Sequence, residues 1–306
     1  MRIALYNPDS PAEFWIHGLH AVWPEAEVAL WTPGSEPADF AIVWAPPQAF
    51  FDDQPGLQAV FNLGAGVDAL LRLRIPPQTQ VVRLEDAGMA VQMAEYVCHA
   101  VLRHFRGLDT YEDDARAGRW RKHGLRVRSD FPVGVMGLGV LGTRVAQALR
   151  GFEFPVNAWS RQPKAVDGIR GFAGAAQLEA FLAASKVLVC LLPLTVETHN
   201  ILNQHTLSRL QPGGYVINVA RGAHLVDTDL LALLDSGHLA GATLDVFHTE
   251  PLPLDHPFWD HPQITITPHI SARTLEAESL AQIVAKLQAL LQGQPVQGVV
   301  QRDRGY

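Results

Sequence analysis

The chain has 306 residues, which is too long for one typical hydrophobic core and suits two domains. Apolar residues make up 48% of the chain and charged residues 18%, so the composition excludes a disordered protein. The net charge is −7 and no block of like charges occurs, which argues against a nucleic-acid-binding groove.

Three features bear on the compartment. The first six residues have the pattern of a β-strand and lack the apolar core of a signal peptide. No apolar stretch reaches the ~20 residues that a membrane span needs. The two cysteines, Cys98 and Cys190, are too few for a disulfide framework. We therefore expect a protein of the reducing cytoplasm with no membrane partner.

In chain order, short runs rich in Val, Ile and Leu alternate with stretches of helical pattern. The predicted strands are 3–6, 27–31, 40–44, 57–63 and 81–84 in the first part, and 133–136, 156–159, 186–192, 215–219, 242–246 and 264–267 in the second. Strands that are apolar on both faces are typical of parallel sheets covered by helices. The alternation predicts an α/β protein with two doubly wound parallel sheets.

Two longer helices are predicted, over residues 91–117 and 273–291, each where a strand series ends. We interpret them as hinge helices between two domains. The first domain is then discontinuous, comprising residues 1–98 and 271–306, and is expected to bind substrate. The second, residues 99–270, is expected to bind a dinucleotide.

A glycine-rich loop follows the predicted strand 133–136. It reads Gly137-Leu138-Gly139-Val140-Leu141-Gly142 and opens a helix. Its three glycines permit a tight turn, close approach of a pyrophosphate to the backbone and close packing of helix on strand. The N-terminus of the helix favours the phosphate charge. The loop therefore indicates a dinucleotide site.

A second loop, residues 64–69, also fits the looser form of this motif and also follows a strand. Spacing alone does not separate the two loops. Five further predicted strands follow the 137–142 loop, enough for a full dinucleotide fold, so we favour that loop for the cofactor. The backbone N–H groups of the 64–69 loop suit a substrate carboxylate, although a plain strand-to-helix turn explains the same sequence.

The end of the predicted strand 156–159 bears on the choice of cofactor. An NAD site usually has Asp or Glu at this point, to bind the ribose 2′-hydroxyl. Here Ser160, Arg161 and Lys164 follow the strand, and no acid occurs before Asp167. A 2′-phosphate suits these side chains, whereas a basic surface turn is the alternative. We predict NADP in preference to NAD.

Three polar residues follow late strands of the second domain. They are Arg221, Glu250 and His269. Because ligands of open α/β sheets bind beyond the carboxyl ends of the strands, we expect these residues to converge.

Their types suit reduction of a 2-keto acid to a 2-hydroxy acid. Arg221 can bind a carboxylate and stabilise charge that grows on the neighbouring carbonyl oxygen. His269 can donate the proton that the alkoxide needs. A carboxylate at Glu250 would favour the protonated imidazole and fix its orientation.

These motifs together resemble the D-isomer-specific 2-hydroxyacid dehydrogenase family. The shared motifs are the 137–142 loop, Val219-Ala220-Arg221-Gly222, Leu244-Asp245-Val246-Phe247, Glu250-Pro251-Leu252-Pro253 and Thr267-Pro268-His269. Within the family the chain is similar to the glyoxylate/hydroxypyruvate reductase A group in residues 62–68, 83–89, 159–161 and 304–306. Order and spacing agree over the whole chain.

The resemblance implies Arg221 as the substrate-binding arginine, Glu250 as partner and His269 as acid and base. It implies that Ala65 and Gly66 bind the substrate carboxylate through their N–H groups. Trp44 is expected to line the substrate pocket, with packing in the core or an interface as the alternative. Further cofactor contacts are implied at Leu192, Pro193, Thr198, Ala220 and Asp245. The group is expected to use NADPH on glyoxylate and hydroxypyruvate and to form homodimers.

Two other functions use the same residues. One is the same reduction, acting on a bulkier 2-keto acid. The other is a dinucleotide-sensing binding protein that recruits a partner, as do the co-repressors related to this family. Intact Arg221, Glu250 and His269 argue for catalysis over sensing.

Overall fold

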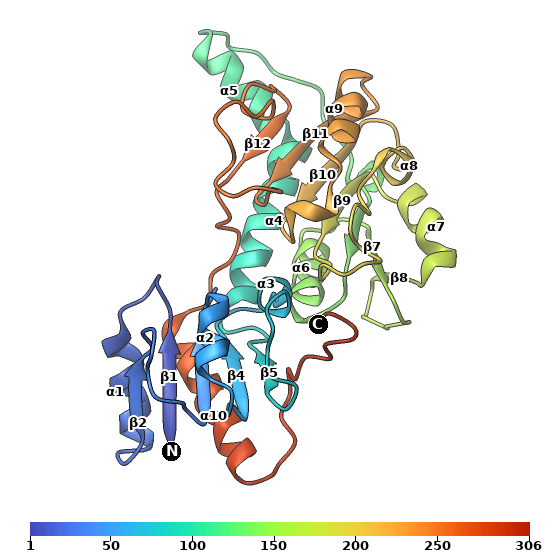
Figure 1. Cartoon of the computed structure of the whole chain (residues 1–306). Helices are drawn as coiled ribbons and strands as arrows, with labels where there is room; N and C mark the ends of the chain where they lie inside the picture. The colour runs from blue at the N-terminus through green and yellow to red at the C-terminus, as the bar shows by residue number, and fades with distance from the viewer. The chain divides into compact units, whose positions relative to one another are not determined.

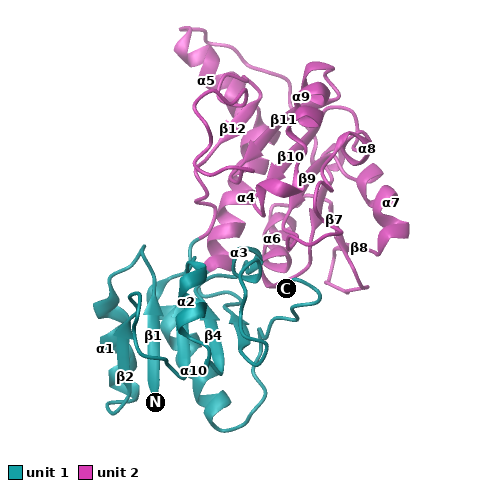
Figure 2. Cartoon of the chain, in the orientation of Figure 1, with its two compact units in different colours: residues 1–88, 273–306 teal, residues 89–272 magenta.

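The computed structural model describes all 306 residues, which form two compact units (Figures 1 and 2). The first comprises Met1–Gly88 and Arg273–Tyr306, and the second Met89–Ala272. The predicted boundary after residue 98 lies inside helix α4 (Met89–Arg106), which belongs in full to the second unit. Because a continuous helix is rigid, the boundary between the two units lies at the N-terminus of α4, between Gly88 and Met89.

The first unit contains a five-stranded parallel sheet in the order β2-β1-β3-β4-β5. Its strands are β1 (Arg2–Tyr6), β2 (Glu27–Leu30), β3 (Phe40–Val43), β4 (Ala59–Asn62) and β5 (Gln80–Arg83). Its helices are α1 (Ala12–Val22), α2 (Gln48–Asp53), α3 (Asp68–Leu71) and α10 (Glu276–Leu291). Ile283 and Leu287 of α10 pack in one core with Ile3 and Leu19, so the C-terminal helix completes the core of this unit.

The second unit contains a seven-stranded parallel sheet in the order β12-β11-β10-β9-β6-β7-β8. The strands are β6 (Val133–Met136), β7 (Val156–Ser160), β8 (Arg170–Ala173), β9 (Val187–Cys190), β10 (Gly214–Asn218), β11 (Leu239–Leu244) and β12 (Ile264–Ile266). Because β6 lies between β7 and β9, the chain changes direction across the sheet at β6. This is the topological switch point at which doubly wound folds bind nucleotides. The predicted fold class is confirmed.

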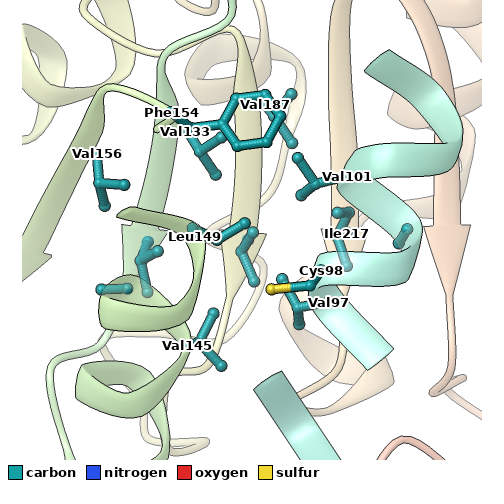
Figure 3. Close-up of a cluster of buried hydrophobic side chains, with 14 of the residues drawn as sticks. Val97, Cys98, Val101, Val133, Val145, Leu149, Phe154, Val156, Val187 and Ile217 are labelled. Atoms are coloured by element: carbon teal, nitrogen blue, oxygen red, sulfur yellow. The ribbon is translucent and has the colours of Figure 1, made fainter. Parts of the chain in front are cut away.

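Helices α4 and α6 (Val140–Gly151) cover one face of this sheet (Figure 3). Their apolar side chains and those of the strands form a single buried cluster, which includes Val97, Cys98, Val101, Val145, Leu149, Val133, Val156, Val187 and Ile217. Full burial of one such side chain contributes about 1.5–3 kcal/mol. The cluster therefore fixes both helices rigidly against the strands whose ends form the site.

Several predicted elements differ from the structure. The predicted helix 91–117 is two helices, α4 and α5 (Leu108–Arg116), separated by Gly107 with φ +61°. Strand β8 was not predicted, and α10 begins at Glu276 rather than residue 273.

The remaining helices of the second unit are α7 (Leu178–Ala183), α8 (Gln204–Leu207) and α9 (Asp227–Asp235). None of the helices has both the length and the apolar character that a membrane span requires.

Candidate active site

The glycine loop connects β6 to α6, as predicted. Gly137 has φ +103°, and a Cβ there would lie 2.7 Å from the carbonyl oxygen of Leu191. A Cβ on Gly142 would lie 1.8 Å from the carbonyl oxygen of Gly137. Side chains are therefore excluded at both positions.

The N-terminus of α6 fits a pyrophosphate. Gly139 is the N-cap of this helix, and a Cβ built on it would meet nothing within 4 Å. Open space beside the first N–H groups of a helix, at the switch point of a doubly wound sheet, is the environment that a dinucleotide phosphate needs. The residues present therefore fit the cofactor that the fold implies.

The predicted 2′-phosphate residues lie at the end of β7: Ser160 is its last residue, and Arg161 and Lys164 follow it. The Ser160 hydroxyl donates to the carbonyl oxygen of Gln162 at 2.7 Å. The Lys164 ammonium donates to the carbonyl oxygen of Leu138 at 2.7 Å, which ties this turn to the glycine loop. An ammonium has three N–H donors, so Lys164 retains capacity for a phosphate, whereas Ser160 must rotate its hydroxyl to donate to one. Arg161 is exposed on the same turn.

The loop after β9 contains Leu192, Pro193 and Thr198. The Thr198 hydroxyl donates to the Pro193 carbonyl at 2.7 Å and so closes the loop on itself. Nε2 of the buried His224 lies 3.3 Å from the same carbonyl. Because β9 is the neighbour of β6, the loop lies at the same edge of the sheet as the glycine loop.

Arg221 follows β10 in a turn organised by the buried Asn218. The Asn218 side chain accepts from the N–H of Ala220 at 3.2 Å and donates to the carbonyl of Arg221 at 2.9 Å. The guanidinium donates to the Ala220 carbonyl at 2.6 Å. A guanidinium has five N–H donors, and this bond uses one of them.

Glu250 and His269 form the central pair. Nδ1 of His269 and Oε2 of Glu250 are 2.7 Å apart, and the two side chains are 44% and 37% exposed. The other carboxylate oxygen accepts from the N–H of Phe247 at 2.9 Å. Because Nδ1 faces a carboxylate it holds the hydrogen of that bond, and Nε2 is the nitrogen that can exchange a proton with a ligand.

Glu250 is held in its ionised form. Burial of the carboxyl acts to raise its pKa, but hydrogen bonds from His269 and the N–H of Phe247, together with the positive charges of His269 and Arg221, outweigh that effect. The pKa of Glu250 therefore lies below its usual value. The three predicted catalytic side chains are thus linked, by a hydrogen bond or by charge, within the second unit.

Asp245 is fully buried at the end of β11. One oxygen accepts from the Thr267 hydroxyl at 2.6 Å and from the N–H of Ile270 at 2.8 Å, and the other accepts from the N–H of Ser271 at 2.8 Å. The structure therefore shows Asp245 holding the turn that contains His269. The predicted contact with the cofactor stays a prediction.

The predicted substrate residues of the first unit follow two neighbouring strands, Trp44 after β3 and Ala65 and Gly66 after β4. The side chain of Asn62 donates to the carbonyls of Gly64 and Gly66 at 3.1 and 3.0 Å, which turns these oxygens inward. The N–H groups of Ala65 and Gly66 have no hydrogen-bond partner within the chain. Trp44 packs over Gly64, where a Cβ would lie 2.7 Å from the indole ring.

Sequence reasoning missed the residues that hold these turns. Asn62, Asn218 and His224 are buried polar residues whose side chains bond backbone carbonyls. Asn62 and Asn218 end apolar strands, an unusual position for a polar residue, and that is the one signal in the sequence that could have identified them.

Comparisons with known proteins agree with this geometry. Residues 98–271 match the family described as D-isomer specific 2-hydroxyacid dehydrogenase, NAD binding domain. The chain is 49% identical to the glyoxylate/hydroxypyruvate reductase A of Serratia proteamaculans (strain 568), with all of both chains aligned. It is 45% identical, again over both full lengths, to the protein of the same name from Yersinia enterocolitica serotype O:8 / biotype 1B. This chain belongs to the D-isomer-specific 2-hydroxyacid dehydrogenase family.

Solved structures support the assignment. A D-isomer specific 2-hydroxyacid dehydrogenase from Xanthobacter autotrophicus Py2, in complex with NADPH and MES, matches with a TM-score of 0.94 and 39% identity, covering 100% of this chain and 99% of that one. The NADPH-dependent glyoxylate/hydroxypyruvate reductase of Sinorhizobium meliloti, in complex with NADP and sulfate, matches with a TM-score of 0.93 and 33% identity over all of both chains. The predicted family and enzyme class, an NAD(P)-dependent oxidoreductase, are confirmed.

Proposed function

We propose that this dehydrogenase uses NADPH to reduce glyoxylate to glycolate and hydroxypyruvate to glycerate. The Serratia and Yersinia relatives have this activity in their names, and the Xanthobacter and Sinorhizobium structures contain NADPH or NADP. The observation that carries the proposal is the 2.7 Å contact between His269 and Glu250.

The residues of the second unit support a defined division of labour. NADPH, when bound, supplies the hydride to the keto carbon. His269 donates a proton from Nε2 to the carbonyl oxygen, and Glu250 stabilises the imidazolium that donates it. The guanidinium of Arg221 stabilises the negative charge that develops on this oxygen. In the direction of oxidation His269 accepts the proton instead.

The substrate carboxylate is assigned to the first unit. Ala65 and Gly66 present unpartnered N–H groups, which are suitable donors for an anion. Trp44 packs on the same loop and is assigned to the wall of the substrate pocket.

Steady-state kinetics test the function. We expect NADPH oxidation with glyoxylate and hydroxypyruvate to exceed that with phenylpyruvate or branched 2-keto acids in kcat/KM. Preference for the bulky acids would overturn the substrate assignment. NADPH binding without turnover of any keto acid would favour a dinucleotide-sensing protein.

A matched pair of variants tests the proton donor. General acid catalysis contributes about 10²–10⁴-fold, so His269→Gln should lower kcat by that order while the Kd for NADPH is retained. His205→Gln is the control, because His205 also lies beside a glutamate, Glu179, at 3.4 Å, and its side chain is 66% exposed. Unchanged turnover in the His269 variant would refute its role.

We also propose that two copies of the chain pair through residues 119–127. This segment has neither helix nor strand, and Trp120, Leu125 and Val127 within it are 98%, 100% and 59% exposed. Large apolar side chains with this exposure on one short segment are typical of an interface. Sedimentation analysis should show a dimer that Leu125→Asp dissociates and that Val196→Asp, altered at a 93% exposed residue elsewhere, leaves intact. A monomeric wild-type chain would overturn this assignment.

The cysteines support the proposed compartment. Cys98 and Cys190 are both free and both buried. Free thiols without disulfides suit the reducing cytoplasm, in which we place the protein.

A further inference from the structure

His269 lies in a backbone conformation that side chains disfavour. Its φ is +54°, in the left-handed region that residues other than glycine rarely adopt. Such conformations persist where the surrounding contacts leave the chain no alternative. The turn follows β12, a three-residue edge strand that pairs only with β11, so the sheet itself gives the turn little support.

The buried carboxylate of Asp245 supplies the missing support on one side. It accepts from the N–H groups of Ile270 and Ser271, both at 2.8 Å, which are the two residues directly after His269. The N–H of His269 itself donates to the Asp245 carbonyl at 2.9 Å. Three successive backbone N–H groups are thus directed at a single residue.

Thr267 connects this carboxylate to helix α4. Its hydroxyl donates to Asp245 at 2.6 Å and lies 2.5 Å from the hydroxyl of Tyr96. A threonine hydroxyl has a single hydrogen, and Asp245 accepts it, so Tyr96 must be the donor in the shorter contact.

The phenol of Tyr96 is suited to remain a donor. Burial raises its pKa to about 12, opposed by the hydrogen bond with Thr267 and reinforced by the charge of Asp245. The helix on which it lies is fixed by the buried side chains of Met93, Val97 and Val101 in the core of the second unit. The hydrogen bonds therefore run from a rigid helix to the turn.

We propose that Tyr96 and Thr267 are positioning residues for His269: they lock Asp245, and through it the left-handed turn that directs Nδ1 at Glu250. The proposal rests on the proposed function of His269 as proton donor. Neither residue needs to touch substrate or cofactor. The consequence is that removal of one hydroxyl on α4 should loosen the turn and misalign the imidazole.

Single-hydroxyl variants test the proposal. Misplacement of a catalytic group by about 1 Å can cost on the order of 10²-fold, so we expect Tyr96→Phe and Thr267→Val to lower kcat by 10-fold or more, with KM for NADPH within about twofold. Thr267→Ser retains the hydroxyl and should restore most of kcat.

Ser185→Ala is the control. Its fully buried hydroxyl donates to the carbonyl of Phe181 on α7 at 2.8 Å, so a buried hydroxyl is lost in the same unit on another helix. A purely structural role for Tyr96 predicts equal effects of Tyr96→Phe and Ser185→Ala on kcat. That result would overturn the proposal.

Amide hydrogen exchange separates this proposal from the proposed function. In Tyr96→Phe the amides of Ile270 and Ser271 should exchange faster than in wild type, whereas in Ser185→Ala they should not. If wild type turns over no keto acid, the proposed function fails and exchange still decides the positioning role. Unchanged protection of both amides in Tyr96→Phe would refute it.

Discussion

Gly222 offers a sharp test of how the site is assembled. It follows Arg221 directly, and a Cβ built on it would lie 1.9 Å from the carbonyl carbon of Phe247 and 2.4 Å from the nitrogen of His248. Both are backbone atoms, which cannot rotate away as a flexible side chain can. Gly222→Ala must therefore displace the 247–248 peptide or the turn that contains Arg221.

The size of the effect follows from the contact. To reach an ordinary separation of 3.4 Å from a starting value of 1.9 Å, the 247–248 peptide and the backbone of Gly222 must move apart by about 1.5 Å. Glu250 moves with the peptide, because its carboxylate accepts from the N–H of Phe247, and Arg221 moves with Gly222. A misplacement of about 1 Å can cost on the order of 10²-fold in rate, equivalent to about 2.7 kcal/mol of transition-state stabilisation. We expect kcat of Gly222→Ala to fall by at least this factor.

The assay is steady-state reduction of glyoxylate, with NADPH binding followed by fluorescence to confirm that the cofactor site is intact. Gly151→Ala is the control, because a Cβ at Gly151 would meet nothing within 4 Å. Turnover of Gly222→Ala within threefold of wild type, with Gly151→Ala also active, would show that the 247–248 peptide does not set the position of Glu250.

Two further outcomes follow from single residues. Burial lowers the pKa of His104 to about 4 from 6.5, and the charge of Arg126 adds to this effect. The unfolded chain therefore binds a proton at His104 that the folded chain does not bind. The free energy of unfolding is unaffected by this residue above pH 6.5 and falls by about 3 kcal/mol as the pH drops toward 4. The free energy of unfolding, measured with urea at pH 7 and pH 4.5, should decrease less in His104→Phe than in wild type. An equal decrease in both proteins would contradict this linkage. Arg161→Ala should raise the KM for NADPH by about 10-fold or more and leave that for NADH unchanged, because a charge-assisted bond to the 2′-phosphate is lost; a parallel rise for both cofactors would place Arg161 outside the phosphate site.

The sequence allowed most of the fold to be predicted because the core strands are apolar on both faces, a pattern that a parallel sheet requires. Strand β8 was missed for the opposite reason. It lies at the edge of its sheet, where Arg170 and Gly171 are exposed and break the apolar run. The break between α4 and α5 was missed because a glycine within a helical pattern does not reveal its φ, and Gly107 at +61° ends the first helix.

The chemically reactive residues could be predicted, whereas their supports could not. Arg221, Glu250 and His269 each follow a strand within a few residues, so the common edge of a parallel sheet brings them together. Tyr96 and Thr267 are 171 residues apart and are joined by one hydrogen bond that no spacing rule anticipates. Contacts of this kind depend on how a helix packs over a sheet, which the sequence pattern leaves open.

Two of the residues that hold the catalytic turns, Asn218 and Asp245, do so in the same way. Asn218 ends β10 and Asp245 follows the neighbouring β11; both are fully buried, and the N–H of Asp245 donates to the carbonyl of Asn218 at 3.0 Å. Each directs its side chain to the backbone of the next turn, which contains Arg221 in one case and His269 in the other. A buried polar side chain is costly unless its hydrogen bonds are made, so the turn can relax only by leaving that side chain unsatisfied. An apolar residue at either position would fill the same space without this penalty, and the turn beside it would no longer be held in one conformation.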